Sequence, residues 1–131
     1  MPYIAQNPNA FLGQSVGDGQ CVALVEKAAN TPHDKAWSRG ILVKGAIVAP
    51  GTIIATFDAK GRYGNHTDGT SHAAIYLGQN ADGIQVIDQW VDVHNGKRRP
   101  HVAQPRTIRW KQFEGKNAKP VNIGDDYYVV Q

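Results

Sequence analysis

The chain has 131 residues, of which 41% are hydrophobic and 19% are charged, and its formal net charge is +3. This composition excludes a disordered chain and indicates one compact domain over residues 1–131 with a core of its own. The single cysteine excludes an internal disulfide, and no apolar run approaches the roughly 18 residues that a membrane-spanning helix needs.

The first residues, MPYIAQNPNAFLGQ, contain no basic segment and no apolar core of signal-peptide length. We therefore expect the protein to be made in the cytoplasm and not to insert into a membrane. Export would then require a route that does not read a conventional signal peptide.

The first half of the chain predicts one helix and one strand. Residues 1–16 contain proline and glycine and are expected to be irregular. From Cys21 onwards, apolar residues recur every three or four positions, which predicts a helix that ends at Asn30. A strand is expected over residues 52–57, followed by a long polar, glycine-rich loop over residues 58–70.

The second half of the chain predicts a series of strands. Residues 71–79 and 84–90 form a hairpin around the turn Asn80-Ala81-Asp82-Gly83. After a basic loop, residues 106–113 are a short strand or turn, and residues 125–130 close the sheet. One helix followed by sequential strands indicates an α+β fold with an antiparallel sheet.

Six basic residues within fifteen positions form the densest charge cluster of the chain. They are Lys97, Arg98, Arg99, Arg106, Arg109 and Lys111. No aromatic ladder or nucleic-acid motif accompanies them, so we do not expect a nucleic-acid partner. The cluster is interpreted as a solvated face, or as a surface that attracts a polyanionic substrate.

The only cysteine, Cys21, lies in the segment GDGQCVALVEKA, where a glycine-rich loop leads into the predicted helix. A helix N-terminus lowers the pKa of a thiol through its dipole and its free N–H groups. Cys21 is therefore a candidate nucleophile. The alternative is a buried cysteine that serves only as a small hydrophobic residue.

A cysteine nucleophile needs an imidazole within reach and a group that orients the imidazole. His72 lies where the polar loop enters a predicted strand, and the return strand of the hairpin brings Asp88 and Gln89 near it. These two neighbours point to opposite faces, so only one can face His72. A carboxylate is the stronger orienting group, which favours Asp88.

Three segments together resemble the NlpC/P60 and CHAP superfamily of papain-like peptidoglycan hydrolases. They are Gly19-Gln20-Cys21 at a helix start, Pro50-Gly51 before an apolar strand, and the segment SHAAIYLG that begins at Ser71. The resemblance covers roughly residues 17–90. A small basic chain without a signal peptide is most similar to the amidase effectors that bacteria inject into rivals by type VI secretion.

The resemblance implies a papain-like fold in which the N-terminal catalytic helix packs on the antiparallel sheet. It also implies a cysteine amidase or endopeptidase that cleaves amide bonds in peptidoglycan stem peptides or cross-links, with Cys21, His72 and Asp88 as catalytic residues. Such a protein acts in the periplasm or cell wall of a target cell, as a monomer without a cofactor, and can have a cognate immunity protein.

Two other readings stay open at this point. One is a different thiol enzyme on the same residues, such as a protease, deamidase or acyltransferase, and the other is a non-enzymatic binding or immunity-type module. Gln20, Tyr63, His66 and Trp90 are expected to line the substrate cleft. The spacing of His66, Asp68 and His72 does not match a zinc motif, so no metal is expected.

Overall fold

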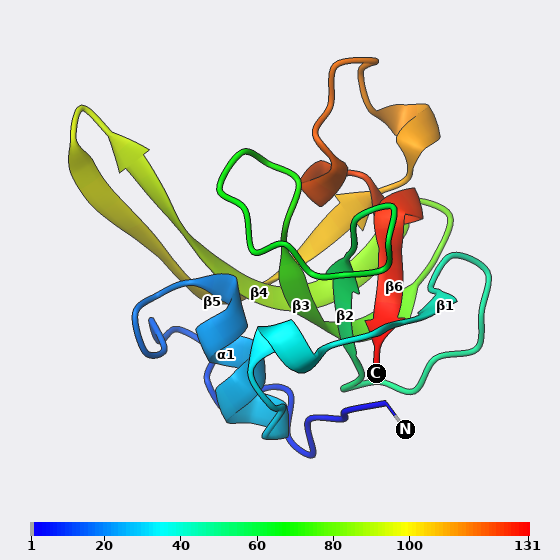
Figure 1. Ribbon diagram of the computed structural model, residues 1–131, viewed down its shortest axis with the longest axis horizontal. Helices are drawn as coiled ribbons and strands as arrows, with labels where there is room; N and C mark the ends of the chain where they lie inside the picture. The colour runs from blue at the N-terminus through cyan, green and yellow to red at the C-terminus, as the bar shows by residue number, and fades with distance from the viewer. Residues whose placement is uncertain (1) are drawn as a thin grey trace.

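The computed structural model describes residues 2–131, which form one antiparallel sheet with a single α-helix packed against it (Figure 1). The strand order is β1-β6-β2-β3-β4-β5, and every neighbouring pair is antiparallel. The elements are α1 (Cys21–Ala29), β1 (Arg39–Leu42), β2 (Ile53–Thr56), β3 (Ala73–Gln79), β4 (Gly83–His94), β5 (Lys97–Arg109) and β6 (Tyr127–Val130). Four short 3-10 helices lie at Asp34–Ala36, Lys111–Phe113, Pro120–Asn122 and Gly124–Asp126. The α+β architecture expected from the sequence is confirmed.

Helix α1 begins at Cys21, as the apolar periodicity predicted, and stops at Asn30 because that residue adopts the left-handed conformation, with φ 55°. The turn before the helix depends on Gly19, whose φ is +86° and whose missing side chain lets Val91 approach. A Cβ added at Gly19 would lie 2.9 Å from Val91 Cγ2. The chain before the helix is therefore held against β4.

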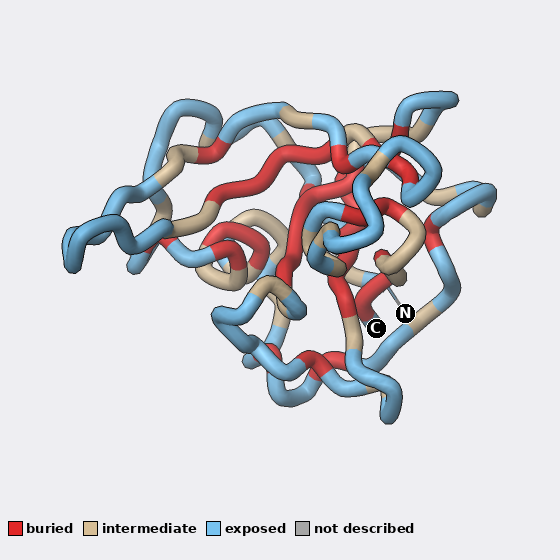
Figure 2. The backbone as a smooth tube through the Cα atoms, turned by 90° about the horizontal axis from the view of Figure 1, so that it is seen from above, coloured by how far each residue is buried: buried red, intermediate tan, exposed pale blue. Residues whose placement is uncertain are grey.

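The sheet separates two apolar clusters, one on each face. Ile75 and Ile87 pack with Leu24 of α1 on one face, whereas Tyr76 and Val86 pack on the other. Because side chains alternate along a strand, two consecutive residues of β4 must point to opposite faces. Figure 2 shows that the buried residues follow these central strands.

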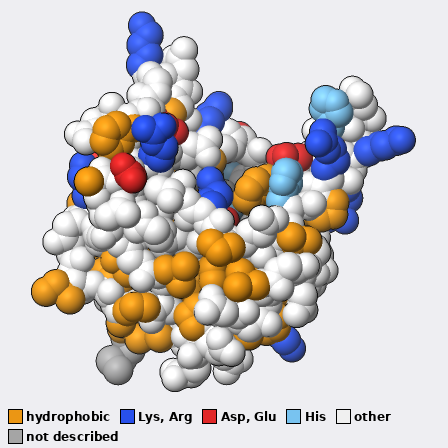
Figure 3. Space-filling view, turned by 180° about the vertical axis from the view of Figure 1, so that it is seen from behind, with side chains coloured by type: hydrophobic (Ala, Val, Ile, Leu, Met, Phe, Trp, Pro, Cys, Tyr) orange, Lys and Arg blue, Asp and Glu red, His pale blue; other side chains and the backbone are white. Residues whose placement is uncertain are grey.

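Strands β4 and β5 continue as a paired hairpin that projects from the body of the sheet (Figure 1). Its tip is Asn95-Gly96, with φ values of 52° and 77°, as a two-residue turn requires. The basic loop predicted here is thus wrong, because the residues near the tip are exposed on both sides and lack apolar alternation. Lys, Arg and His side chains gather on this projecting hairpin (Figure 3), which carries Lys97, Arg98 and Arg99.

No helix within residues 2–131 has both the length and the apolar character needed to cross a membrane.

Candidate active site

Cys21 lies at the first position of α1, and its side chain faces the interior, with 8% of the residue exposed. Its Sγ lies 3.5 Å from the Tyr63 hydroxyl oxygen. Tyr63 was expected at the cleft rim, but it is only 7% exposed and packs beneath Cys21 against Trp37 and Phe57. That expected position is wrong, because the long loop folds its aromatic side chain into the core beside the helix start.

His72 immediately precedes β3, and its backbone is fixed to the end of β2 on both sides. The His72 N–H donates to Thr56 Oγ1 (3.1 Å), and the Thr56 N–H donates to the His72 carbonyl (3.0 Å). The ring is buried, and its Nε2 lies 2.7 Å from Asp88 Oδ2. This pairing occupies Nε2 and leaves Nδ1 as the ring nitrogen that can serve the thiol.

Asp88, which is 1% exposed, is also held by Arg106 of β5. The Arg106 Nε lies 3.1 Å from Oδ1 and 2.8 Å from Oδ2, and an Nη lies 2.7 Å from Oδ2. The guanidinium also lies 5.0 Å from the centre of the Trp90 ring. A row of alternating charge therefore runs from the buried His72 and Asp88 to the partly exposed Arg106.

Burial opposes ionisation of the Cys21 thiol, but the charge and hydrogen bond of His72 outweigh it, so the pKa of Cys21 is lowered. Burial likewise disfavours a charged His72, yet Cys21 and Asp88 raise the pKa of His72 to about 9. Despite its burial, the pKa of Asp88 is lowered by its bonds to His72 and Arg106. The arrangement favours a thiolate paired with an imidazolium.

Gln89, the alternative orienting residue, faces away from His72. It is fully buried on the helix side of the sheet, where its amide binds the loop before Cys21. The Val16 N–H donates to Gln89 Oε1 (2.9 Å), and Gln89 Nε2 donates to the carbonyls of Val16 (2.9 Å) and Gln20 (2.7 Å). Asp88 is therefore the neighbour that reaches the imidazole.

A cleft of about 780 Å³ lies over Cys21 and His72, between the 65–71 loop and the projecting hairpin. Gln20, His66 and Trp90, which the sequence predicts to bind substrate, line this cleft. The Trp90 ring stacks on His101 with centroids 4.4 Å apart, and His101 Nε2 lies 2.7 Å from Asp92 Oδ2. These contacts give the hairpin wall of the cleft a fixed aromatic surface.

The side chains of His66, Asp68 and His72 do not converge on a common point. Asp68 accepts hydrogen bonds from the backbone and hydroxyl of Thr70, and His72 is turned towards Asp88. Across residues 2–131, no group of three His, Cys, Asp or Glu side chains is placed to hold a metal ion.

Sequence reasoning missed the contact of Arg106 with Asp88, because Arg106 was placed in a basic cluster interpreted as a solvated face or as a surface that attracts a polyanionic substrate. Arg106 lies one strand away from Asp88, where β5 pairs Arg106 with Val86. The available signal was Asn95-Gly96, a dipeptide typical of two-residue hairpins. A hairpin folded at that dipeptide would have placed Arg106 beside the strand that carries Asp88.

Comparison with known proteins places this chain among amidase effectors. The family model described as domesticated amidase effector 2 matches residues 2–130. A Salmonella typhi protein named type VI secretion amidase effector 2 protein is 42% identical over 143 residues, covering all of both chains. The domesticated amidase effector 2 of Ixodes scapularis is 34% identical over 134 residues, covering 95% of this chain and 82% of the relative.

A solved structure, type 6 secretion amidase effector 2 (Tae2), matches with a TM-score of 0.79 at 32% identity. The match covers 98% of this chain and 94% of the solved one. This likeness extends over the helix and the whole sheet, and it agrees with the papain-like α+β fold expected from the sequence. The chain belongs to the domesticated amidase effector 2 family.

Proposed function

We propose that this protein is an antibacterial cysteine amidase that hydrolyses amide bonds in peptidoglycan stem peptides or cross-links. The observation that carries the proposal is Cys21 at the helix start beside a buried His72–Asp88 pair, on the floor of a cleft, in a chain of an amidase effector family. Residues 1–131 act as a single catalytic domain of the NlpC/P60 type, without a cofactor.

In the proposed reaction the Cys21 thiolate attacks the carbonyl carbon of the scissile amide. The backbone N–H of Cys21, at the helix start, is the natural donor to the developing oxyanion. His72, oriented through Nε2 by Asp88, gives its Nδ1 proton to the leaving amine as the C–N bond breaks. The same nitrogen then takes a proton from water, whose oxygen attacks the thioester and releases the acid and Cys21.

Tyr63 stabilises the thiolate of Cys21 from the core side of the site. Burial and the nearby Cys21 raise the pKa of Tyr63 well above its ordinary value, so the phenol stays protonated. Its hydroxyl can then donate to the Cys21 sulfur at 3.5 Å. A donor at this distance stabilises the thiolate over the thiol.

Delivery and partners follow from the same proposal. As a type VI effector, the protein passes into a target cell and acts on the wall in the periplasm, as a monomer. A cognate immunity protein protects the producing cell. The basic residues of the hairpin, Lys97, Arg98 and Arg99, attract the anionic wall polymer.

Digestion of purified peptidoglycan tests the proposal, with the products identified by mass spectrometry. The wild type should release fragments that have gained one water at an amide bond, and Cys21→Ala should release none while keeping the wild-type circular dichroism spectrum. His66→Ala is the matched cleft variant and should retain most turnover. Hydrolysis by Cys21→Ala, or inactivation by EDTA together with loss of activity in His66→Ala, would contradict the cysteine mechanism.

A further inference from the structure

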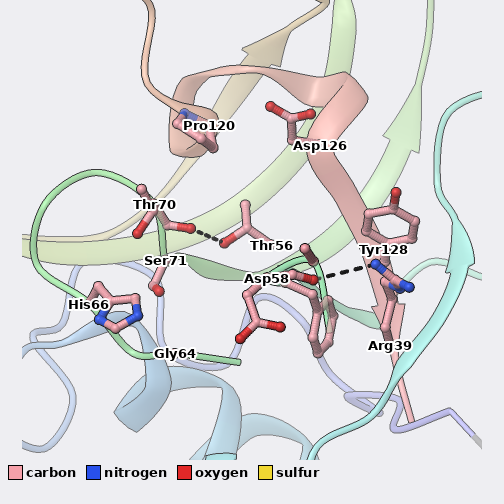
Figure 4. Close-up of a pocket in the computed structure, with 12 residues that line it drawn as sticks. Arg39, Thr56, Asp58, Gly64, His66, Thr70, Ser71, Pro120, Asp126 and Tyr128 are labelled. Atoms are coloured by element: carbon pink, nitrogen blue, oxygen red, sulfur yellow. Dashed lines mark hydrogen bonds between the residues drawn. The ribbon is translucent and has the colours of Figure 1, made fainter. Parts of the chain in front are cut away.

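A second pocket, the side pocket, lies next to the catalytic cleft. Figure 4 shows the side pocket with the residues that line it. It has a volume of about 290 Å³ and lies between the 56–71 segment, Arg39 and the start of β6. His66 and Ser71 line both the cleft and the side pocket, so the two spaces share one wall. The side pocket is therefore adjacent to the cleft over Cys21.

Arg39 brings a positive charge to the side pocket. Its guanidinium lies 5.3 Å from the centre of the Tyr128 ring, and its Nη1 donates to the Asp58 carbonyl at 3.4 Å (Figure 4). The side chain also rests against Gly61, where an added Cβ would lie 3.7 Å from Arg39 Nε. Within residues 2–131 no carboxylate forms an ion pair with Arg39, so its charge is oriented but not neutralised.

Asp126 brings a negative charge to the same pocket. It lies at the end of the last 3-10 helix and is half-buried, yet within residues 2–131 its carboxylate has neither a hydrogen-bond donor nor an ion-pair partner. Its neighbour Asp125 is already engaged by Lys44 at 2.6 Å and by the Lys111 N–H at 2.7 Å. Burial, together with the charge of Asp125, raises the pKa of Asp126.

Arg39 and Asp126 line one pocket, and within residues 2–131 neither has an ion-pair partner. The other carboxylate of the lining, Asp58, is already held by the Lys60 and Arg62 N–H groups and by the Arg62 side chain. In the catalytic cleft, by contrast, Asp88 and Arg106 pair with each other. A ligand with one anionic and one cationic group would satisfy both charges of the side pocket. A small amino-acid group fits the volume and carries both.

We propose that the side pocket binds a zwitterionic amino-acid group, with the ammonium at Asp126 and the carboxylate at Arg39. The assignment deepens the proposed function and rests on it: a stem-peptide residue whose amino and carboxyl groups are both free enters the side pocket while the scissile bond lies over Cys21. The side pocket thereby determines which residue of the peptide is recognised and how far along the peptide that residue lies from the bond that is cut.

Three small probes separate the two charges. Alanine carries both groups, N-acetylalanine only the carboxylate, and alaninamide only the ammonium. We expect alanine at millimolar concentration to shift the backbone amide NMR signals of Ser71, Asp126 and Tyr128 in the wild-type protein. Asp126→Asn should abolish the response to alaninamide, and Arg39→Gln the response to N-acetylalanine. Asp82→Asn and Arg109→Gln make the same charge changes at exposed positions and should respond as the wild type does.

Acetylation of the free amines of purified peptidoglycan supplies the kinetic test. It should raise the wild-type KM about tenfold or more, as loss of a charge-assisted hydrogen bond does, and Asp126→Asn should no longer distinguish the two substrates. Unshifted pocket signals, or equal probe responses in all variants, would overturn the assignment even if peptidoglycan is hydrolysed. If the probes bind as expected but Cys21→Ala still hydrolyses peptidoglycan, the proposed function fails and the pocket assignment stands.

Discussion

Gln89 gives the sharpest prediction on how Cys21, the proposed nucleophile, is held in place. Its amide makes three hydrogen bonds to the loop that leads into Cys21, and the side chain is fully buried. Replacement by alanine removes all three and leaves one N–H and two carbonyls of that loop without this partner. At about 1 kcal/mol net for each bond, we expect Gln89→Ala to lower the free energy of unfolding by about 3 kcal/mol.

Turnover should fall more than stability alone accounts for, because Cys21 follows Gln20, one of the anchored residues, directly in the chain. Urea unfolding measures the stability, and peptidoglycan hydrolysis under conditions where each variant is folded measures the turnover. Gln112→Ala is the matched control, since Gln112 is exposed and makes no side-chain hydrogen bond within residues 2–131.

Gln89→Glu separates lost hydrogen bonds from lost volume. A carboxylate can still accept from the Val16 N–H, but it also faces the carbonyls of Val16 and Gln20, which need donors. Glu should therefore be at least as destabilising as Ala, although it fills the same space. A fully active, wild-type-stable Gln89→Glu, or a loss below about 1 kcal/mol in Gln89→Ala, would refute the reasoning.

Three further predictions concern charge. Arg106→Gln should lower turnover and should move acid unfolding to higher pH. The lowered pKa of Asp88 contributes stability that is lost as the pH falls, and part of that lowering comes from Arg106. An unchanged midpoint of acid unfolding would contradict this. Iodoacetamide should alkylate Cys21 at pH values below the usual pKa of a thiol, because the pKa of Cys21 is lowered. His72→Ala should shift this alkylation to higher pH. Turnover of the wild type should fall as the pH rises through about 9, where His72 loses its proton. The double variant Lys97→Gln, Arg99→Gln should weaken the salt dependence of KM. Lys116→Gln, which lies outside the hairpin, should leave that dependence unchanged. Equal salt dependence of KM in the double variant and in Lys116→Gln would argue against attraction of the substrate by the hairpin.

The parts of the site predicted from sequence are those that local rules determine. The glycines before Cys21 and the apolar spacing after it define the helix start, and Asn80 to Gly83 predict the turn that returns β4 alongside β3. From that turn, alternation alone limited the partner of His72 to Asp88 or Gln89. The contact of Asp88 with His72 needed the register, which shifts between Tyr76 and Gly78 and cannot be counted from the turn.

The remaining site residues depend on contacts between distant segments. Tyr63 lies in a loop whose polar composition predicts exposure, yet its ring is packed by Trp37, far along the chain from it. The side pocket is lined by Arg39, from an edge strand, and by Asp126, from near the C-terminus. These two residues line the same pocket because β6 pairs with both β1 and β2. No periodicity predicts that insertion, because the last strand of a chain can add to either edge of a sheet or between two others.

Arg106 explains how a full carboxylate can serve as the orienting group in a buried site. A thiolate and Asp88 on either side of His72 would place two anions around one cation, and burying a net charge away from water is costly. Arg106 adds the second cation, so the four groups sum to no net charge: Cys21 negative, His72 positive, Asp88 negative and Arg106 positive. Its Nε and Nη both reach Oδ2, the oxygen that also binds His72, and they compete with the imidazole for that oxygen. In the proposed reaction, Asp88 is thereby kept ionised and does not take the proton that His72 gives to the leaving amine.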